Sequence, residues 1–150
     1  MQLVVLGLNH KTAPVGIREC FSFSEEQVRI ALRHINKADD IHEGVILSTC
    51  NRTEIYAVVD DPEEALAVLL DFFSDLSSET DQAEEYFFYH CGEACIKHLF
   101  RVAASLDSLV IGEGQILSQV KKAYAVAKDI GATSTVLNTL FHRAIAVGKR

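Results

Sequence analysis

The residues best suited to covalent chemistry lie around Cys50, in the polar run Thr49-Cys50-Asn51-Arg52-Thr53. This run follows the apolar segment Val45–Ser48, and a turn at the end of a strand holds a nucleophile in a position fixed by the sheet. Arg52 lies two residues on, where its charge can stabilise a thiolate or bind a substrate carboxylate. The spacing therefore predicts a cysteine nucleophile; a half-buried structural cysteine in a turn is the alternative.

His98, within a predicted helix, is the second candidate for chemistry. A helical spacing of four and then three residues brings Cys91, Cys95 and His98 to one face. With His90 added, these are ligand types that zinc prefers, although C-x3-C on a helix lacks the usual turn between cysteines. Two other interpretations stay open. Either Cys95 packs in the core and His98 forms a structural hydrogen bond, or His98 faces Cys50 as its acid or base.

A third candidate is the glycine-containing run Ser105-Leu106-Asp107-Ser108-Leu109-Val110-Ile111-Gly112-Glu113-Gly114-Gln115, with Gln119 one helical turn later. Its glycines let the backbone approach a ligand, and a helix N-terminus behind them can hold an anion. It is no dinucleotide fingerprint, because G-x-G-x-x-G after a strand is missing. A plain turn between helices is the alternative. The polar loop from Asn9 to Pro14 predicts a structured turn rather than a site.

The elements that must position these residues follow from hydrophobic periodicity and capping signals. Strands are expected in four apolar segments: Gln2–Leu8, Val45–Ser48, Ile55–Val59 and Tyr86–His90. Two helices are expected between them, one opened by a capping box at Ser24–Gln27 and ending near Asn36, the other running from Asp61-Pro62 to about Asp75. The order β-α-β-β-α-β over residues 1–90 predicts an α+β fold, a ferredoxin-like sandwich.

The remaining residues, 91–150, predict an all-helical segment. The expected helices are Glu93–Leu106, Glu113–Ile130, and a third from Thr133 or Ser134 to the end. The last of these has no stop signal before Arg150, so we expect a truncated helix and a piece of a longer protein. Both parts, 1–90 and 91–150, are expected to belong to one catalytic domain.

Composition and charge narrow the class of protein. The 150 residues are 49% hydrophobic and 23% charged, which suits one folded domain and excludes general disorder. The N-terminus lacks a basic region and a cleavage site, and no stretch reaches the roughly 18 apolar residues of a membrane span, so a cytoplasmic protein is expected. The four cysteines are then expected to be free thiols.

Charge is divided unevenly along the chain. Residues 1–96 hold 6 of the 14 Lys and Arg and 18 of the 21 Asp and Glu, a balance of −12. Residues 97–150 carry a balance of +5 within the overall charge of −7. This asymmetry suggests a polyanionic partner for the C-terminal third, and ordinary solvated helix faces are the alternative.

Taken together, three motifs closely resemble the N-terminal catalytic region of glutamyl-tRNA reductases. They are Gly7-Leu8-Asn9-His10-Lys11-Thr12-Ala13-Pro14, Leu47-Ser48-Thr49-Cys50-Asn51-Arg52-Thr53-Glu54-Ile55-Tyr56 and Ser108-Leu109-Val110-Ile111-Gly112-Glu113-Gly114-Gln115-Ile116. The resemblance covers essentially the whole chain. It implies NADPH-dependent reduction of glutamyl-tRNA(Glu) to glutamate-1-semialdehyde, the first step of five-carbon tetrapyrrole (porphyrin and haem) biosynthesis.

The resemblance also assigns roles to residues. It implies that the Cys50 thiolate attacks the ester, releases tRNA and leaves an enzyme thioester, with His98 assisting. Substrate contacts are implied for Thr49, Asn51, Arg52, Ser108, Glu113, Gly114, Gln115 and Gln119. No metal is expected. The chemistry is reasonable, because a thioester is easier to reduce by hydride than an oxygen ester, which explains a cysteine rather than a serine.

Family members have two further parts, an NADPH-binding domain and a helical dimerisation domain, which these 150 residues lack. We therefore expect no cofactor-binding residues here, and acyl transfer followed by slow hydrolysis without hydride delivery. The full-length protein is expected to be a homodimer, this part a monomer or weak oligomer, and glutamate-1-semialdehyde aminomutase a candidate partner. The competing interpretations are a tRNA-binding module without chemistry and a zinc-stabilised structural domain.

Overall fold

The structure, a computed structural model, describes residues 1–76, 84–106 and 115–149. Strands in these ranges form one antiparallel sheet in the order β2-β3-β1-β4. They are β1 (Gln2–Asn9), β2 (Ile41–Ser48), β3 (Arg52–Val59) and β4 (Phe88–Cys91). The helices are α1 (Val15–Cys20), α2 (Glu25–Lys37), α3 (Pro62–Ser74), α5 (Glu93–Ala103), α6 (Gln115–Ile130) and α7 (Thr135–Gly148), with a 3-10 turn at Glu84–Tyr86.

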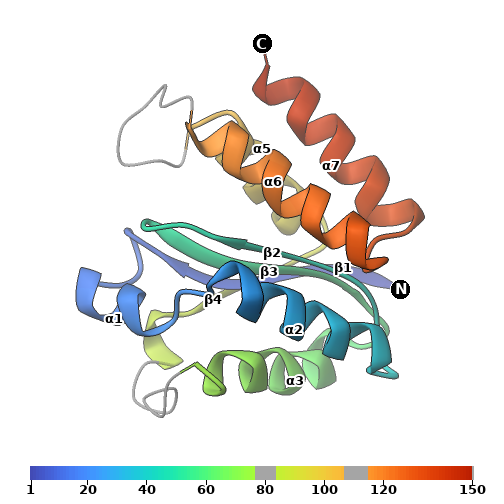
Figure 1. The fold of residues 1–150 in the computed structure, drawn as a ribbon, viewed down its shortest axis with the longest axis horizontal. Coiled ribbons are helices and arrows are strands. Elements are labelled where there is room, and N and C mark those ends of the chain that lie inside the picture. The colour runs from blue at the N-terminus through green and yellow to red at the C-terminus, as the bar shows by residue number, and fades with distance from the viewer. Residues whose placement is uncertain (77–83, 107–114, 150) are drawn as a thin grey trace.

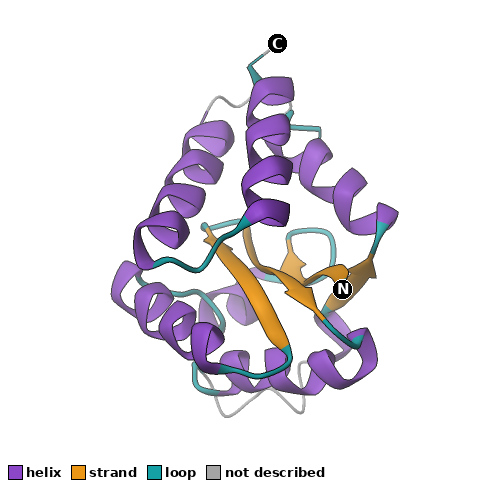
Figure 2. Cartoon of the chain, turned by 90° about the vertical axis from the view of Figure 1, so that its right-hand side faces the viewer, coloured by secondary structure: helices purple, strands orange, loops and turns teal. Residues whose placement is uncertain are grey.

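The sheet is the middle of three layers. Helices α2 and α3 cover one face, and α5, α6 and α7 cover the other (Figure 1). The view turned by 90° also shows the sheet between two helical layers (Figure 2). All eight residues of β3 are therefore buried, although strands alternate their side chains between faces. The predicted α+β class is confirmed, and the helical segment forms the second cover of the sheet.

The capping signals place the two helices of the first layer as predicted. The Ser24 side chain accepts from the Gln27 backbone N–H at 3.2 Å, and the Gln27 side chain accepts from the Ser24 N–H at 2.8 Å. At the start of α3, Asp61 caps the helix and Pro62 occupies its first turn. The four residues of α2 that the structure buries are Val28, Ala31, Leu32 and Ile35, as the periodicity predicts.

The element boundaries depart from the sequence prediction where polar residues are buried. Strand β2 begins at Ile41, four residues early, because buried Glu43 bonds to the start of α7. Strand β3 begins at Arg52, three residues early, for a similar reason described below. Helix α5 ends at Ala103 rather than Leu106. Helix α1 was not predicted, because its start at Pro14 has no capping side chain.

The structure bears on two further predictions, the state of the cysteines and the presence of a membrane-spanning helix. All four cysteines are free thiols, as predicted. Within the described ranges, every helix is too short or too polar to cross a bilayer.

Candidate active site

Cys50 lies in the tight turn that joins β2 to β3. The Thr49 hydroxyl accepts hydrogen bonds from the backbone N–H groups of Asn51 and Arg52, both at 3.2 Å. The Thr49 N–H donates to the Arg52 carbonyl at 2.8 Å, which closes the turn. The sheet and these bonds fix the loop backbone, while the Cys50 side chain is exposed at its tip.

The start of α6 faces this turn. A small pocket is lined by residues 49–52 together with Gln115, Ile116 and Gln119. The two glutamines predicted as substrate contacts thus lie beside Cys50, although more than 60 residues separate them from it in the sequence. The other three predicted contacts on that segment, Ser108, Glu113 and Gly114, lie outside the described residues.

Behind the turn, a carboxylate holds three polar side chains within the protein. Glu54 is fully buried and accepts from Arg52 Nη1 at 3.1 Å. The oxygen that accepts from Arg52, Oε2, also lies 2.6 Å from His98 Nε2. The other oxygen of Glu54, Oε1, accepts from the Tyr56 hydroxyl at 2.8 Å. Arg52 itself is only 1% exposed. The start of β3 is thus an ionic network, with each member on the sheet face that α5 covers.

The network keeps Glu54 ionised. Burial alone raises the pKa of this carboxyl, but the hydrogen bond and charge of His98, with the charge of Arg52 and the Tyr56 hydroxyl, lower it below its ordinary value. Burial and the Glu54 charge raise the pKa of Tyr56 well above its usual range, so Tyr56 remains a donor. Because an ionised carboxylate only accepts, Nε2 of His98 carries the shared hydrogen and donates it to Glu54.

Gly7 provides the space that Glu54 occupies. Gly7 pairs with Glu54 across β1 and β3. A Cβ at position 7 would lie 2.5 Å from the Thr53 carbonyl oxygen and 2.9 Å from Glu54 Cγ. No L side chain fits there without moving the strand, so a glycine opposite the buried carboxylate is a packing requirement.

His98 packs among rings on the far side of the network. Its ring centroid lies 4.9 Å from that of Phe88 and 5.5 Å from that of His90. Its side chain is 10% exposed. Among the contacts of the described residues, none joins His98 to Cys50. The two are linked through Arg52 and Glu54.

Comparison with known proteins adds family information to this geometry. Residues 6–150 match the family model for the N-terminal domain of glutamyl-tRNA(Glu) reductase. The chain belongs to the glutamyl-tRNA reductase family. It is 45% identical to a glutamyl-tRNA reductase of Desulfatibacillum aliphaticivorans and 47% identical to one of Geobacillus thermodenitrificans, in each case over the whole chain but only 35% and 33% of the relative.

A solved structure agrees with this assignment. Glutamyl-tRNA reductase from Methanopyrus kandleri superposes with a TM-score of 0.80 and 36% identity, and the match covers 99% of this chain and 33% of that one. The chain therefore spans about a third of the length of the reductases it matches.

The four residues considered as zinc ligands do not form a metal site among the described residues. Cys95 is fully buried, and burial raises the pKa of its thiol far above the usual range. Cys91 is exposed, and His98 is bound to Glu54. Across residues 1–76, 84–106 and 115–149, no group of three or more His, Cys, Asp and Glu side chains is placed to hold a metal. Of the alternatives for this helix, the structure shows a packed Cys95 and a hydrogen-bonded His98.

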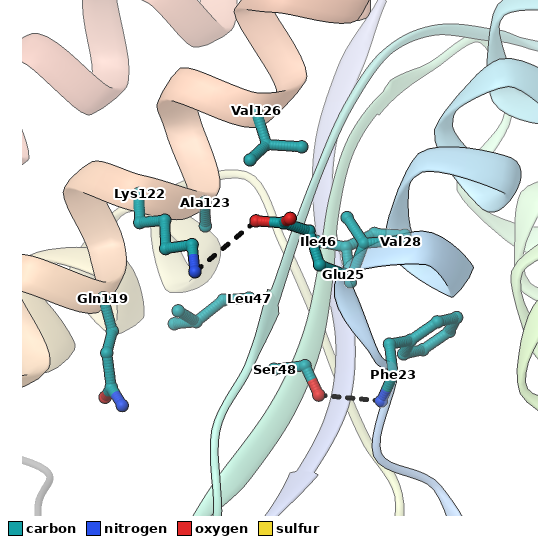
Figure 3. Close-up of a pocket in the computed structure, with 10 residues that line it drawn as sticks. All are labelled: Phe23, Glu25, Val28, Ile46, Leu47, Ser48, Gln119, Lys122, Ala123 and Val126. Atoms are coloured by element: carbon teal, nitrogen blue, oxygen red, sulfur yellow. Dashed lines mark hydrogen bonds and ion pairs between the residues drawn. The ribbon is translucent and has the colours of Figure 1, made fainter.

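A second cavity lies beside the site, between helices α2 and α6. A groove of about 190 Å³ follows the outer edge of β2 between α2 and α6 (Figure 3). Its walls are mainly apolar, and Gln119 lines both this groove and the Cys50 pocket. Lys122 crosses its mouth to pair with Glu25 at 3.4 Å, while Lys121 is exposed. Lys122, one of the basic residues of the C-terminal third, is thus already paired.

Sequence reasoning missed three residues of this region. Glu54 and Gly7 lie within motifs of the reductase resemblance, but their pairing depends on the register of β1 with β3. The available signal was two opposite charges, Arg52 and Glu54, two residues apart in an apolar strand, which places both on one buried face. Arg18, on the unpredicted helix α1, donates to Asn51 at 3.4 Å.

Proposed function

We propose that this chain is the acyl-transfer part of a glutamyl-tRNA reductase and that Cys50 accepts the glutamyl group. The observation that carries the proposal is an exposed thiol at the tip of a fixed turn, directly beside a buried Arg52–Glu54–His98 network. The family of the chain and the glutamines lining the same pocket support it.

The proposed step balances with no group other than the substrate, this chain and water. The Cys50 sulfur attacks the ester carbonyl, a C–S bond forms, and the C–O bond to the terminal ribose of tRNA breaks. The thiol proton passes to the departing ribose oxygen by way of solvent, because Cys50 is exposed and no contact among the described residues joins it to His98. Glu54 fixes the His98 ring through Nε2 at 2.6 Å, as a carboxylate does for a catalytic histidine. Thr49, Asn51, Arg52, Gln115 and Gln119 orient the glutamyl group.

The reduction is proposed for the full-length protein. There, bound NADPH would supply the hydride needed to reduce the acyl group to glutamate-1-semialdehyde. A Rossmann-type dinucleotide site is built on parallel strands joined by helices, whereas every strand pair among the described residues is antiparallel. These residues do not fit the cofactor, so NADPH is assigned to a region that the longer relatives contain.

Other properties of the full-length protein are proposed on the same basis. They are recognition of tRNA(Glu), a role in tetrapyrrole biosynthesis, a homodimer and delivery of the aldehyde to glutamate-1-semialdehyde aminomutase. Each is a property of the full-length protein, and this chain spans about a third of the length of its relatives.

Deacylation of glutamyl-tRNA tests the proposal without NADPH. The chain is expected to release free glutamate slowly, because water hydrolyses the thioester, and Cys50→Ser is expected to abolish this release. Cys91→Ser is the matched control, because Cys91 is also exposed but lies on β4 away from the turn. Equal deacylation by wild type and Cys50→Ser would contradict the proposal, and binding of tRNA without deacylation would favour a binding module.

A further inference from the structure

We propose that Arg18 of α1 binds an oxyanion of the acyl substrate beside Cys50. The inference rests on the proposed function and adds a residue to it. The oxyanion is either the free carboxylate of the glutamyl group or a phosphate at the acceptor end of the tRNA.

The position of Arg18 points to the site. Its Nη1 donates to the Asn51 side-chain oxygen at 3.4 Å, and Asn51 is the neighbour of Cys50 in the turn. Helix α1 lies at the end of the sheet where β2 turns into β3 (Figure 1). Because Asn51 directly follows Cys50, the Arg18 guanidinium lies beside the position of an acyl group on Cys50.

The hydrogen bonds of Arg18 are incomplete. An arginine has five N–H donors, and the bond to Asn51 is at the long limit for a hydrogen bond. The Nε atom of Arg18 is buried and has no hydrogen-bond partner within residues 1–76, 84–106 and 115–149. A buried donor without a partner costs free energy, so its retention calls for an explanation. An oxyanion that accepts from Nε and an Nη group together would satisfy it bidentately.

The charge of Arg18 is also uncompensated. Arg52 pairs with Glu54 at 3.1 Å and Arg29 pairs with Asp129 at 3.3 Å. Among the described residues, no carboxylate forms an ion pair with Arg18. Arg52 is 1% exposed and neutralised, whereas Arg18 is half-buried and donates to Asn51, which lines the Cys50 pocket. A partly desolvated guanidinium without a counter-charge favours an incoming anion.

The experiment measures Cys50 acylation against substrate concentration for wild type, Arg18→Gln and Arg18→Met. Arg33→Gln is the matched control, because Arg33 is exposed on α2. Two substrates are used: glutamyl-tRNA, and the glutamyl ester of adenosine, which has no phosphate. The half-saturating concentration is expected to rise about 10- to 100-fold in both Arg18 variants, the size expected for a charge-assisted hydrogen-bonded pair.

The two substrates distinguish the source of the oxyanion. A rise with both identifies the glutamyl carboxylate. A rise with glutamyl-tRNA alone identifies a phosphate, and the slope of log affinity against log salt should then fall by about 0.7. Unchanged half-saturation with both substrates, matching Arg33→Gln, would overturn the inference. If wild type itself forms no adduct, the proposed function fails instead.

A thermal melt separates binding from a structural role. Removing a guanidinium with an unsatisfied buried Nε is expected to leave the melting temperature unchanged or raise it. Variants that unfold or melt lower would show that Arg18 stabilises the fold, which contradicts the inference.

Discussion

Two buried glutamates on neighbouring strands of this domain have different kinds of partner. Glu43 on β2 is 3% exposed and accepts from the backbone N–H groups of Ser134, Leu137 and Val136 at 2.7, 2.9 and 3.3 Å. It therefore caps α7, where a helix N-terminus favours negative charge. Its oxygens bond to the main chain, so its role is to join α7 to the sheet.

Glu54 on β3 is equally buried, but its partners are the side chains of Arg52, His98 and Tyr56. Two of these partners, Arg52 and His98, are basic side chains. Arg52 also borders the Cys50 turn. Burial of a carboxylate alone therefore does not indicate function. Its partners separate a structural carboxylate from one that prepares a reacting site.

The largest expected effect is on the rate of acyl transfer. Glu54→Gln removes the charge that orients His98 and Arg52 but keeps the shape, so acylation of Cys50 is expected to slow by about 100-fold or more. The same change at Glu43 is expected to leave the rate per folded molecule unaltered. Quenched-flow measurement of both variants checks this, and an equal loss in the two would erase the distinction between them.

For the free energy of unfolding, Glu43 is the glutamate whose replacement is expected to matter. Glu43→Ala leaves three N–H groups at the start of α7 without their acceptor, and the free energy of unfolding is expected to fall by about 2 kcal/mol. Denaturant unfolding measures this. A loss below about 0.5 kcal/mol, the range of ordinary surface changes, would show that Glu43 does not anchor the helix.

The glycines beside the two carboxylates give a smaller and sharper test. Gly7→Ala places a Cβ 2.5 Å from the Thr53 carbonyl oxygen and 2.9 Å from Glu54 Cγ. Gly44→Ala places one 3.0 Å from Cδ1 and Cγ2 of Ile35, a less severe contact that involves a side chain instead of the backbone. We expect a loss of about 1–3 kcal/mol at position 7, with slower acylation, and a smaller loss at position 44. Melting curves that rank the two the other way would contradict the close packing around Glu54.

The smallest effect concerns pH. The pKa of Glu54 is lower in the folded chain than its ordinary 4.5, so its ionised form stabilises the fold above that value. That contribution is lost as the pH falls below 4.5 through the folded pKa. Wild type should lose stability more steeply over this interval than Glu54→Gln. Parallel stability curves for the two proteins would show that the network does not lower the pKa.

Features encoded locally could be predicted from the sequence. The capping box at Ser24 and the polar turn around Cys50 depend on neighbours a few residues away, and the structure has both. Glutamyl-tRNA reductase motifs brought Gln115 and Gln119 into the site, and the structure lines one pocket with them.

Features that depend on strand register could not. The Glu54–His98 bond joins residues 44 apart, and the one from Glu43 to Ser134 joins residues 91 apart. Each puts a charged residue where composition suggests a loop, which is why β2 and β3 are longer than periodicity predicts. Helix α1 has no cap and no buried stripe, so Arg18 had no sequence signal at all.

The most direct test of the account is the intact mass of the chain after mixing with glutamyl-tRNA and a rapid acid quench. We expect one glutamyl adduct on wild type and on Cys91→Ser, and none on Cys50→Ser. An adduct that persists in Cys50→Ser, or the absence of one from wild type together with no release of glutamate, would contradict the assignment of Cys50 as the acyl acceptor.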